Sequence, residues 1–117
     1  MFERLADEDF AYLTTTGRKT GRAHRIEIWF AVDRGRLYLL AGGGDKADWV
    51  KNIRKNGRVR VQVGTRSVAA RARIARQGPE DRNARELLDA KYMAWTAKKK
   101  LSSWARGATP VVIDLPR

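Results

Sequence analysis

Short segments in which apolar and polar residues alternate, separated by glycine-containing turns, are the feature of this sequence that most restricts its fold. Between residues 23 and 33, one set of alternate positions is mainly apolar, namely Ile26, Ile28, Phe30 and Val32. A period of two residues is that of a β-strand with one buried face. The same period recurs in residues 58–64 and 66–76, which flank a Gly-Thr turn. Paired segments of this kind predict β-hairpins.

Six strands are predicted in total, over residues 9–16, 23–33, 36–42, 58–64, 66–76 and 109–115. The segment 36–42 is apolar at successive positions, which predicts a central strand or one covered by a helix. Pro110 cannot donate a hydrogen bond to a neighbouring strand, so the last strand is predicted to lie at an edge of the sheet at its Pro110 end.

Two longer helices are predicted between these strands. The first begins after Asp45, whose side chain is a favourable N-cap, and ends before Gly57. The second begins around Pro79 and extends toward the lysines at 98–100, and a short segment follows at 101–106. The pattern predicts a single domain, residues 1–117, of the α+β class: a mainly β, six-stranded small barrel flanked by helices.

The composition limits the chemistry that this chain can perform. It contains no cysteine and one histidine, His24, which excludes disulfides, thiolate sites and metal sites built from several histidines. No nucleophile with a neighbouring base and no carboxylate pair stands out, so the catalytic residues stay unidentified and no metal is predicted. If the protein is an enzyme, a bound cofactor supplies the reactive group.

The chain is strongly basic, with 25 Lys and Arg against 13 Asp and Glu, a net charge of +12. Such a charge predicts an anionic partner, which could be a nucleic acid, an anionic lipid or a polyanionic small molecule. Eight cations and no acid lie between residues 54 and 76. No apolar run is long enough to cross a bilayer, and the first residues lack the apolar core of a signal peptide. We therefore expect a cytoplasmic protein, with peripheral membrane contact left open.

A glycine-flanked cationic turn follows the first predicted strand. Gly17 and Gly21 allow sharp turns on either side of Arg18, Lys19 and Thr20. This places two cations, a hydroxyl and backbone N–H groups at one tip, which suits a phosphate or a carboxylate. The alternative interpretation is an ordinary hairpin turn with solvated charges.

A second candidate segment is the triglycine at residues 42–44, which leads into the first predicted helix. It lets a planar ligand approach the backbone near a helix N-terminus, although it lacks the spacing of a nucleotide-binding motif. The alternative is a flexible connection. Trp49 and Asn52 are three residues apart on that helix and can face one pocket; alternatively, Trp49 belongs to the core and Asn52 to the surface.

In combination these segments resemble the deazaflavin-dependent nitroreductase and quinone reductase family, from about residue 13 to the end. The matching segments are Thr14-Thr15-Thr16-Gly17-Arg18-Lys19-Thr20-Gly21, Arg25-Ile26-Glu27-Ile28-Trp29-Phe30, Leu39-Leu40-Ala41-Gly42-Gly43-Gly44, Trp49-Val50-Lys51-Asn52 and Val59-Arg60-Val61. The resemblance implies a split β-barrel of the flavin-reductase type. It also implies the deazaflavin coenzyme F-420, whose tail carries a phosphate and several glutamates.

By this resemblance the protein is an oxidoreductase that passes a hydride from reduced F-420 to a quinone, a nitro compound or a similar electron-poor acceptor. The implied coenzyme-binding residues are Thr16, Arg18, Lys19, Thr20, Ala41, Gly42, Gly43, Gly44, Trp49 and Asn52. Arg18, Lys19 and Thr20 would hold the phosphate and tail, and residues 41–44 would line the ring. Some relatives have tyrosines in the late helix near the acceptor, where this chain has Trp95, Lys98 and Leu101.

Two other functions compete with this one. The same barrel could hold FMN or haem, or the basic hairpin could bind nucleic acid. The second is disfavoured, because residues 58–76 contain no aromatic side chain on which bases could stack. The expected partner is therefore a small-molecule acceptor and no specific nucleic acid, with the protein a monomer or a homodimer.

Overall fold

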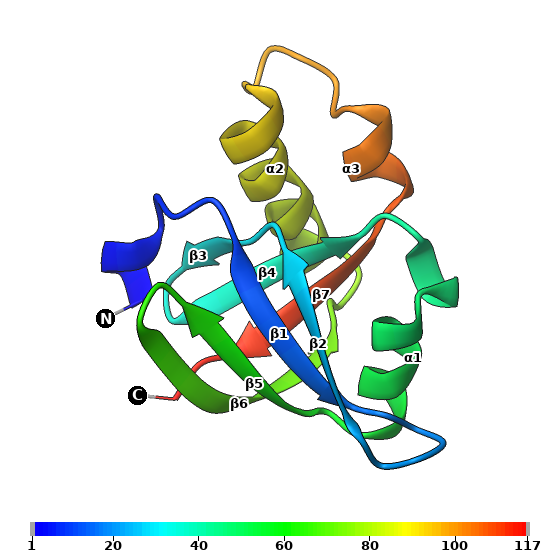
Figure 1. The fold of residues 1–117 in the computed structure, drawn as a ribbon. Coiled ribbons are helices and arrows are strands. Elements are labelled where there is room, and N and C mark those ends of the chain that lie inside the picture. The colour runs from blue at the N-terminus through cyan, green and yellow to red at the C-terminus, as the bar shows by residue number, and fades with distance from the viewer. Residues whose placement is uncertain (1, 117) are drawn as a thin grey trace.

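The computed structural model describes residues 2–116, which form one curled antiparallel sheet with helices on two sides (Figure 1). The strands are β1 (Ala11–Thr16), β2 (Ala23–Ile28), β3 (Ala31–Asp33), β4 (Arg36–Ala41), β5 (Arg58–Val63), β6 (Arg66–Ile74) and β7 (Thr109–Asp114). The helices are α1 (Asp48–Lys55), α2 (Pro79–Met93) and α3 (Ser103–Gly107), with short 3-10 turns η1 (Phe2–Leu5) and η2 (Gly44–Lys46). The predicted split-barrel fold is confirmed.

The strand order is β2-β1-β5-β6-β7-β4-β3, so β2 and β3 lie at opposite edges of the sheet although they are consecutive in the chain. Ile28 pairs with Ala11 of β1, whereas Ala31 pairs with Tyr38 of β4. The predicted single strand over 23–33 is therefore divided at Trp29 and Phe30, where the chain crosses from one edge to the other. This crossing curls the sheet into a half-barrel.

One apolar cluster fills the concave side of the sheet. It is built from alternate residues of several strands, including Leu13, Leu37, Leu39, Val61 and Ile113. Val50 and Ile53 of α1 join this cluster and close the open side of the half-barrel. The alternation predicted from the sequence therefore marks the buried face of these strands correctly.

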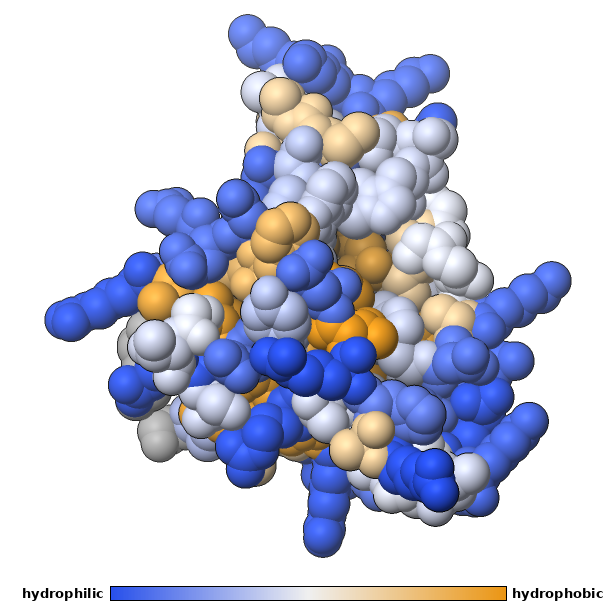
Figure 2. All heavy atoms as spheres, viewed as in Figure 1, coloured by the Kyte–Doolittle hydropathy of each residue, from blue (hydrophilic) through white to orange (hydrophobic). Residues whose placement is uncertain are grey.

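A second cluster lies between the convex face of the sheet and the helices α2 and α3. Tyr38, Leu40 and Val112 of the sheet pack there against Ala84 and Leu88 of α2. Because β4 contributes to both clusters, its run of consecutive apolar residues is explained, as the sequence predicted. The side of the molecule over β1, β2 and β5 has no helix in front of it and carries many hydrophilic side chains (Figures 1 and 2).

Several element boundaries differ from the predicted ones. Asp45 does not cap α1: it lies in η2, and its carboxylate accepts from Arg54 and Thr109, while Ala47 is the N-cap. The helix α2 ends at Met93, well before the lysines at 98–100. The strand β7 is not at an edge but between β4 and β6, and its pairing with β6 begins at Val111, so Pro110 needs no N–H on that side.

None of the helices within residues 2–116 is both long enough and apolar enough to cross a membrane.

Candidate functional site

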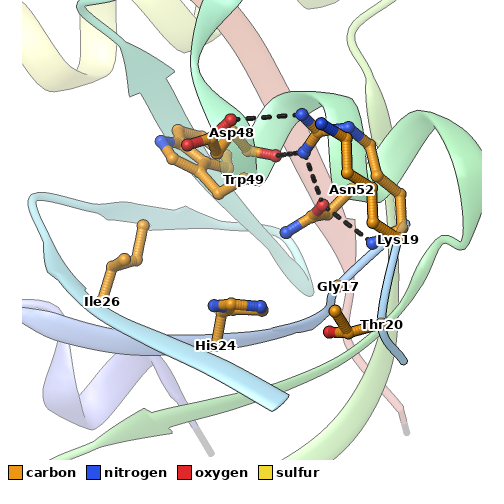
Figure 3. Close-up of a pocket in the computed structure, with 9 residues that line it drawn as sticks. Gly17, Lys19, Thr20, His24, Ile26, Asp48, Trp49 and Asn52 are labelled. Atoms are coloured by element: carbon orange, nitrogen blue, oxygen red, sulfur yellow. Dashed lines mark hydrogen bonds and ion pairs between the residues drawn. The ribbon is translucent and has the colours of Figure 1, made fainter. Parts of the chain in front are cut away.

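A pocket of about 470 Å³ lies between the cationic turn, strand β2 and helix α1 (Figure 3). Five of the residues selected from the sequence line it, namely Arg18, Lys19, Thr20, Trp49 and Asn52. The other lining residues are Gly17, His24, Ile26 and Asp48. Figure 3 shows the α1 side chains facing those of β2 across this space. The fold therefore brings together two sequence motifs that are about thirty residues apart in the chain.

The turn itself is held by backbone hydrogen bonds. The Gly17 N–H donates to the Arg22 carbonyl at 2.7 Å, and the Gly21 N–H donates to the Gly17 carbonyl at 2.9 Å. Gly21 has a φ of +75°, which favours glycine. A Cβ on Gly17 would lie 2.7 Å from Nε2 of His24, so a side chain there would require the His24 ring to move. The backbone of the turn thus favours glycine at position 21, and the space beside Gly17 is occupied by the His24 ring, which supports the interpretation of this motif as a shaped loop.

Asn52 connects the turn to α1 and to β1. Its side chain is buried, at 4% exposure. Its Oδ1 accepts from the backbone N–H of Arg18 at 3.1 Å and from Arg18 Nη1 at 3.0 Å, and its Nδ2 donates to Thr15 Oγ1 at 3.1 Å. Asn52 therefore belongs to the site, as predicted, but its polar atoms are bonded to the protein.

Arg18 is also bonded within the protein. Its Nη2 lies 3.3 Å from Asp48 Oδ1, and Lys55 Nζ donates to its carbonyl oxygen at 2.8 Å. The place of Asp48 at the pocket could not be predicted from the sequence, because its partner Arg18 is 30 residues away in the chain. The Asp48 side chain is 85% exposed and places one negative charge at the pocket.

Lys19 and Thr20 form the exposed part of the turn. Within residues 2–116, the Lys19 ammonium group has no hydrogen-bond or ion-pair partner. The Thr20 hydroxyl accepts from the backbone N–H of Arg22 at 3.3 Å, which leaves its own proton available. Trp49 is half-buried and lines the pocket with Ile26, so the pocket combines apolar walls with a cationic rim.

The remaining predicted residues lie outside this pocket. Thr16 ends β1 immediately before the turn, and Ala41 ends β4 and is buried. Gly42 and Gly43 are exposed, and a Cβ on Gly42 would lie 3.7 Å from Nε1 of Trp104. Gly44 has a φ of +64° and begins η2. The triglycine therefore precedes α1 but contributes no lining residue to the pocket at the turn.

An aromatic cluster lies near the triglycine and was not recognised as a unit in the sequence. The rings of Trp29 and Tyr92 stack with centroids 4.3 Å apart, and Trp104 meets Trp29 edge-on at 5.4 Å. Trp29, Trp104, Phe10 and Leu40 line a second pocket of about 240 Å³. The three aromatic residues are more than 10 positions apart in sequence, so periodicity gives no indication of their contact.

The environment of Tyr92 fixes its hydroxyl. That oxygen accepts from the Phe30 N–H at 3.0 Å and lies within hydrogen-bond distance of the Asp9 and Phe30 carbonyls. Burial raises the pKa of Tyr92 above its ordinary value. The Tyr92 side chain therefore connects α2 to the segment between β2 and β3. Because its pKa is raised, the phenol is neutral at physiological pH.

Comparison with known proteins agrees with this fold. Over residues 2–116 the sequence matches the model of the F-420H(2)-dependent quinone reductase family, and the chain belongs to that family. A conserved hypothetical protein from Mycobacterium tuberculosis superposes with a TM-score of 0.78 at 22% identity, covering 100% of this chain and 81% of that one.

Two further solved structures share the fold. An F-420-H2 dependent reductase superposes with a TM-score of 0.68 at 22% identity, covering 90% of this chain and 93% of that one. A FAD-binding protein from Mesorhizobium loti gives a TM-score of 0.69 at 18% identity, covering 98% and 86%. At these identities the structures show a common split-barrel fold, and the family match shows that the protein is an F-420-dependent type of oxidoreductase.

Proposed function

We propose that the pocket between the turn and α1 binds coenzyme F-420, and that the protein uses the reduced coenzyme to reduce a quinone or a nitro compound. The observation that carries this proposal is the convergence of the cationic turn and Trp49 on one pocket. Family membership supports the identity of the coenzyme. The acceptor is proposed from the description of the family as quinone reductases and from the resemblance noted in the sequence.

The residues present fit such a coenzyme. A volume of about 470 Å³ lies in the range of small-molecule sites. Trp49 and Ile26 offer apolar surface, whereas Lys19 and Thr20 offer a charge and a hydroxyl at the rim. Ammonium and hydroxyl groups are suitable donors to phosphate and carboxylate oxygens. The pocket therefore matches a ligand with an apolar part and an anionic part.

Each part of the site has a separate proposed role. Lys19 and Thr20 contact the anionic part of the coenzyme directly. Asn52 holds Arg18 in the turn, where Arg18 adds positive potential that the exposed Asp48 carboxylate partly offsets. Thr16 and the backbone of residues 41–44 contact the remainder of the coenzyme. The exposed Gly42 and Gly43 have no side chain that would obstruct its ring.

When bound in reduced form, the deazaflavin would supply a hydride to an electron-poor acceptor. The protein would orient the two reactants and exclude water from between them. The aromatic pocket of Trp29 and Trp104, next to Gly42, is the proposed position of the acceptor. Within the described structure the Tyr92 hydroxyl is bonded to backbone groups, so Tyr92 is proposed to position Trp29 and not to donate a proton.

Titration of the purified protein with F-420, FMN and haem, followed by tryptophan fluorescence, tests the coenzyme. We expect F-420 to quench Trp49 and the other two to bind weakly or not at all. Turnover with a panel of quinones and nitroaromatics then tests the acceptor. Tight binding of FMN or haem without binding of F-420 would contradict the proposal.

A double substitution tests the turn. Arg18→Ala with Lys19→Ala should weaken F-420 binding by about 2 kcal/mol or more, roughly 30-fold, because charge-assisted contacts and loop shape are lost together. The matched control is Arg82→Ala with Lys98→Ala, which removes the same charge from exposed positions on and after α2. Equal weakening in both variants would show that only net charge matters.

A further inference from the structure

The N–H edge of the Trp104 indole ring faces Gly42. Nε1 of Trp104 lies 3.7 Å, and Cδ1 3.8 Å, from the point where a Cβ on Gly42 would stand, so the missing side chain leaves this edge uncovered. Among residues 2–116 the Trp104 N–H has no hydrogen-bond acceptor. No buried side-chain nitrogen or oxygen of these residues lacks a partner, so this N–H is open to solvent although the side chain is half-buried. A ligand beside Gly42 can therefore reach it.

The short helix that carries Trp104 is held at both ends by α2, which lies beside it (Figure 1). At its start, the buried Asp89 carboxylate accepts from the Ser102 backbone N–H at 2.8 Å and from the Ser102 hydroxyl at 2.7 Å. At its end, Nη1 of Arg85 donates to three backbone carbonyls at 2.6 to 3.0 Å. A helix of five residues is not stable alone, so these contacts keep Trp104 in place.

Aromatic packing fixes the orientation of the indole ring. The planes of Trp104 and Trp29 meet at 86°, and Trp29 in turn stacks on Tyr92 with the two planes 1° apart. The Tyr92 hydroxyl accepts from the Phe30 N–H at 3.0 Å. The Trp104 N–H therefore has a defined direction before a ligand binds, as is required of a preorganised donor.

The pocket that Trp104 lines with Trp29 contains few polar side chains. Glu27 is the one ionisable residue among its described lining, and its carboxylate accepts from the Tyr12 hydroxyl at 3.0 Å. None of the described lining residues is a Lys, Arg or His, and only the two tryptophans have a side-chain N–H. Negative charge that develops on a molecule in this pocket is therefore stabilised by an indole N–H and not by a cation.

We propose that the Trp104 N–H donates a hydrogen bond to the oxygen atom of the acceptor that becomes negatively charged during reduction. This makes Trp104 a catalytic residue, and the inference rests on the proposed function, which places the acceptor beside Gly42. The reduced coenzyme gives up a hydride to the acceptor and a proton to solvent. A quinone that receives the hydride becomes the hydroquinone anion and then takes one proton from solvent. Trp104 transfers no proton and acts as a fixed dipole toward the anion.

Nuclear magnetic resonance of the indole N–H groups tests this contact in the wild-type protein. The protein is loaded with oxidised F-420, so that no turnover occurs, and menadione is added as the quinone. We expect the Trp104 signal to shift and its N–H to exchange more slowly with water, because it gains an acceptor. The Trp95 N–H, which already donates to the Lys99 carbonyl at 3.0 Å, is the internal reference and should not change.

Two substitutions separate the N–H from the rest of the ring. Trp104→Phe removes the donor. Trp104→His keeps one, because imidazole Nε2 lies two bonds from Cγ in a five-membered ring, as the indole nitrogen does. With F-420 saturating and the pH at about 8, where imidazole is neutral, menadione should reoxidise the reduced coenzyme about tenfold or more slowly in Trp104→Phe. Trp104→His should be several-fold faster than Trp104→Phe.

The outcomes distinguish this inference from the proposed function. Equal rates in wild type and both variants would overturn the inference, and equal slowing of both variants would show that Trp104 only fills space. Thermal unfolding verifies that each variant is folded, and the resonance experiment decides the question with the wild-type chain if one is not. Turnover of wild type with an unmoved Trp104 signal at saturating menadione overturns this inference alone. Failure of wild type to bind F-420 overturns the proposed function and this inference with it.

Discussion

Asn52 shows how a single buried polar residue organises the candidate site. Its amide satisfies the backbone and the side chain of Arg18 as well as the Thr15 hydroxyl. Buried polar groups of this kind are costly to leave unpaired. The sequence indicated that Asn52 shares a helix face with Trp49, but its bonding to the turn could not be predicted. That bonding depends on a residue 34 positions away.

Removing the Asn52 amide should therefore affect both stability and binding. We expect Asn52→Ala to lower the free energy of unfolding by about 1–3 kcal/mol, because the Arg18 N–H and Thr15 hydroxyl lose a partner in a buried place. The turn should also become mobile, which would weaken coenzyme binding. Chemical denaturation and fluorescence titration measure the two effects. A variant with unchanged stability and unchanged affinity would contradict the role given to Asn52.

Asp48 provides a more specific test of the electrostatics of the pocket. Its exposed carboxylate pairs with Arg18 and lies where an anionic ligand is proposed to bind. Asp48→Asn should tighten F-420 binding several-fold, since it removes a repulsive charge and releases the Arg18 guanidinium. The dissociation constant at low salt measures this, and weaker binding would show that the ion pair is needed to shape the site.

At the scale of elements, the sequence predicted each strand segment but not the way in which the sheet curls. Alternation identified residues 23–33 as extended, yet nothing in that pattern marks the crossing at Trp29 and Phe30. The crossing depends on which strands lie at the two edges, a property of the whole sheet. The prediction that Asp45 caps α1 was wrong for a similar reason. Its carboxylate accepts hydrogen bonds from Arg54 and Thr109, and these contacts depend on the folded structure.

The crossing is held by the last turns of α2. Lys91 Nζ donates to the Glu8 and Phe30 carbonyls and lies 3.7 Å from the centre of the Phe30 ring, and burial lowers its pKa. Tyr92 bonds to both backbone groups of Phe30. These contacts connect a helix and a strand edge that are about sixty residues apart in the chain.

Tyr92→Phe should therefore destabilise the barrel while keeping its stacking with Trp29. We expect a loss of about 1–2 kcal/mol, because the Phe30 N–H would lose its hydrogen-bond acceptor in a partly buried environment. Thermal or urea unfolding measures this loss, and the Trp29 contact is preserved because the ring is unchanged. An unchanged unfolding midpoint would mean that water replaces the phenol at no cost.

At the scale of the whole molecule, the basic residues fall into two groups. One group is structural, as in the network of Arg36 and Arg73 with Glu80 and Asp114, which joins β4, β6, β7 and the start of α2. The other group, Arg25, Arg58, Arg60 and Arg71, forms no ion pair within residues 2–116; Asp114 lies directly opposite Arg71 but is bonded to Arg36 and Arg73. The sequence showed the excess of charge and its concentration between residues 54 and 76, but only the register of the strands separates the two groups.

The structural network predicts a dependence of stability on acid pH. Hydrogen bonding to Arg73 lowers the pKa of Glu80 from its ordinary 4.5 to about 2. A carboxylate with a lowered folded-state pKa stabilises the protein above its unfolded pKa, and this contribution is lost as the pH falls. The melting temperature should therefore decrease between pH 4.5 and 2. Glu80→Gln should make that decrease smaller, and an equal decrease in both proteins would exclude this role.

The most direct test of the central claim is a crystal structure of the protein with F-420 bound. The account predicts that the coenzyme phosphate lies within hydrogen-bond distance of Lys19 or Thr20 and that the ring contacts the backbone of residues 41–44. A phosphate held elsewhere on the molecule, far from the turn between β1 and β2, would contradict it.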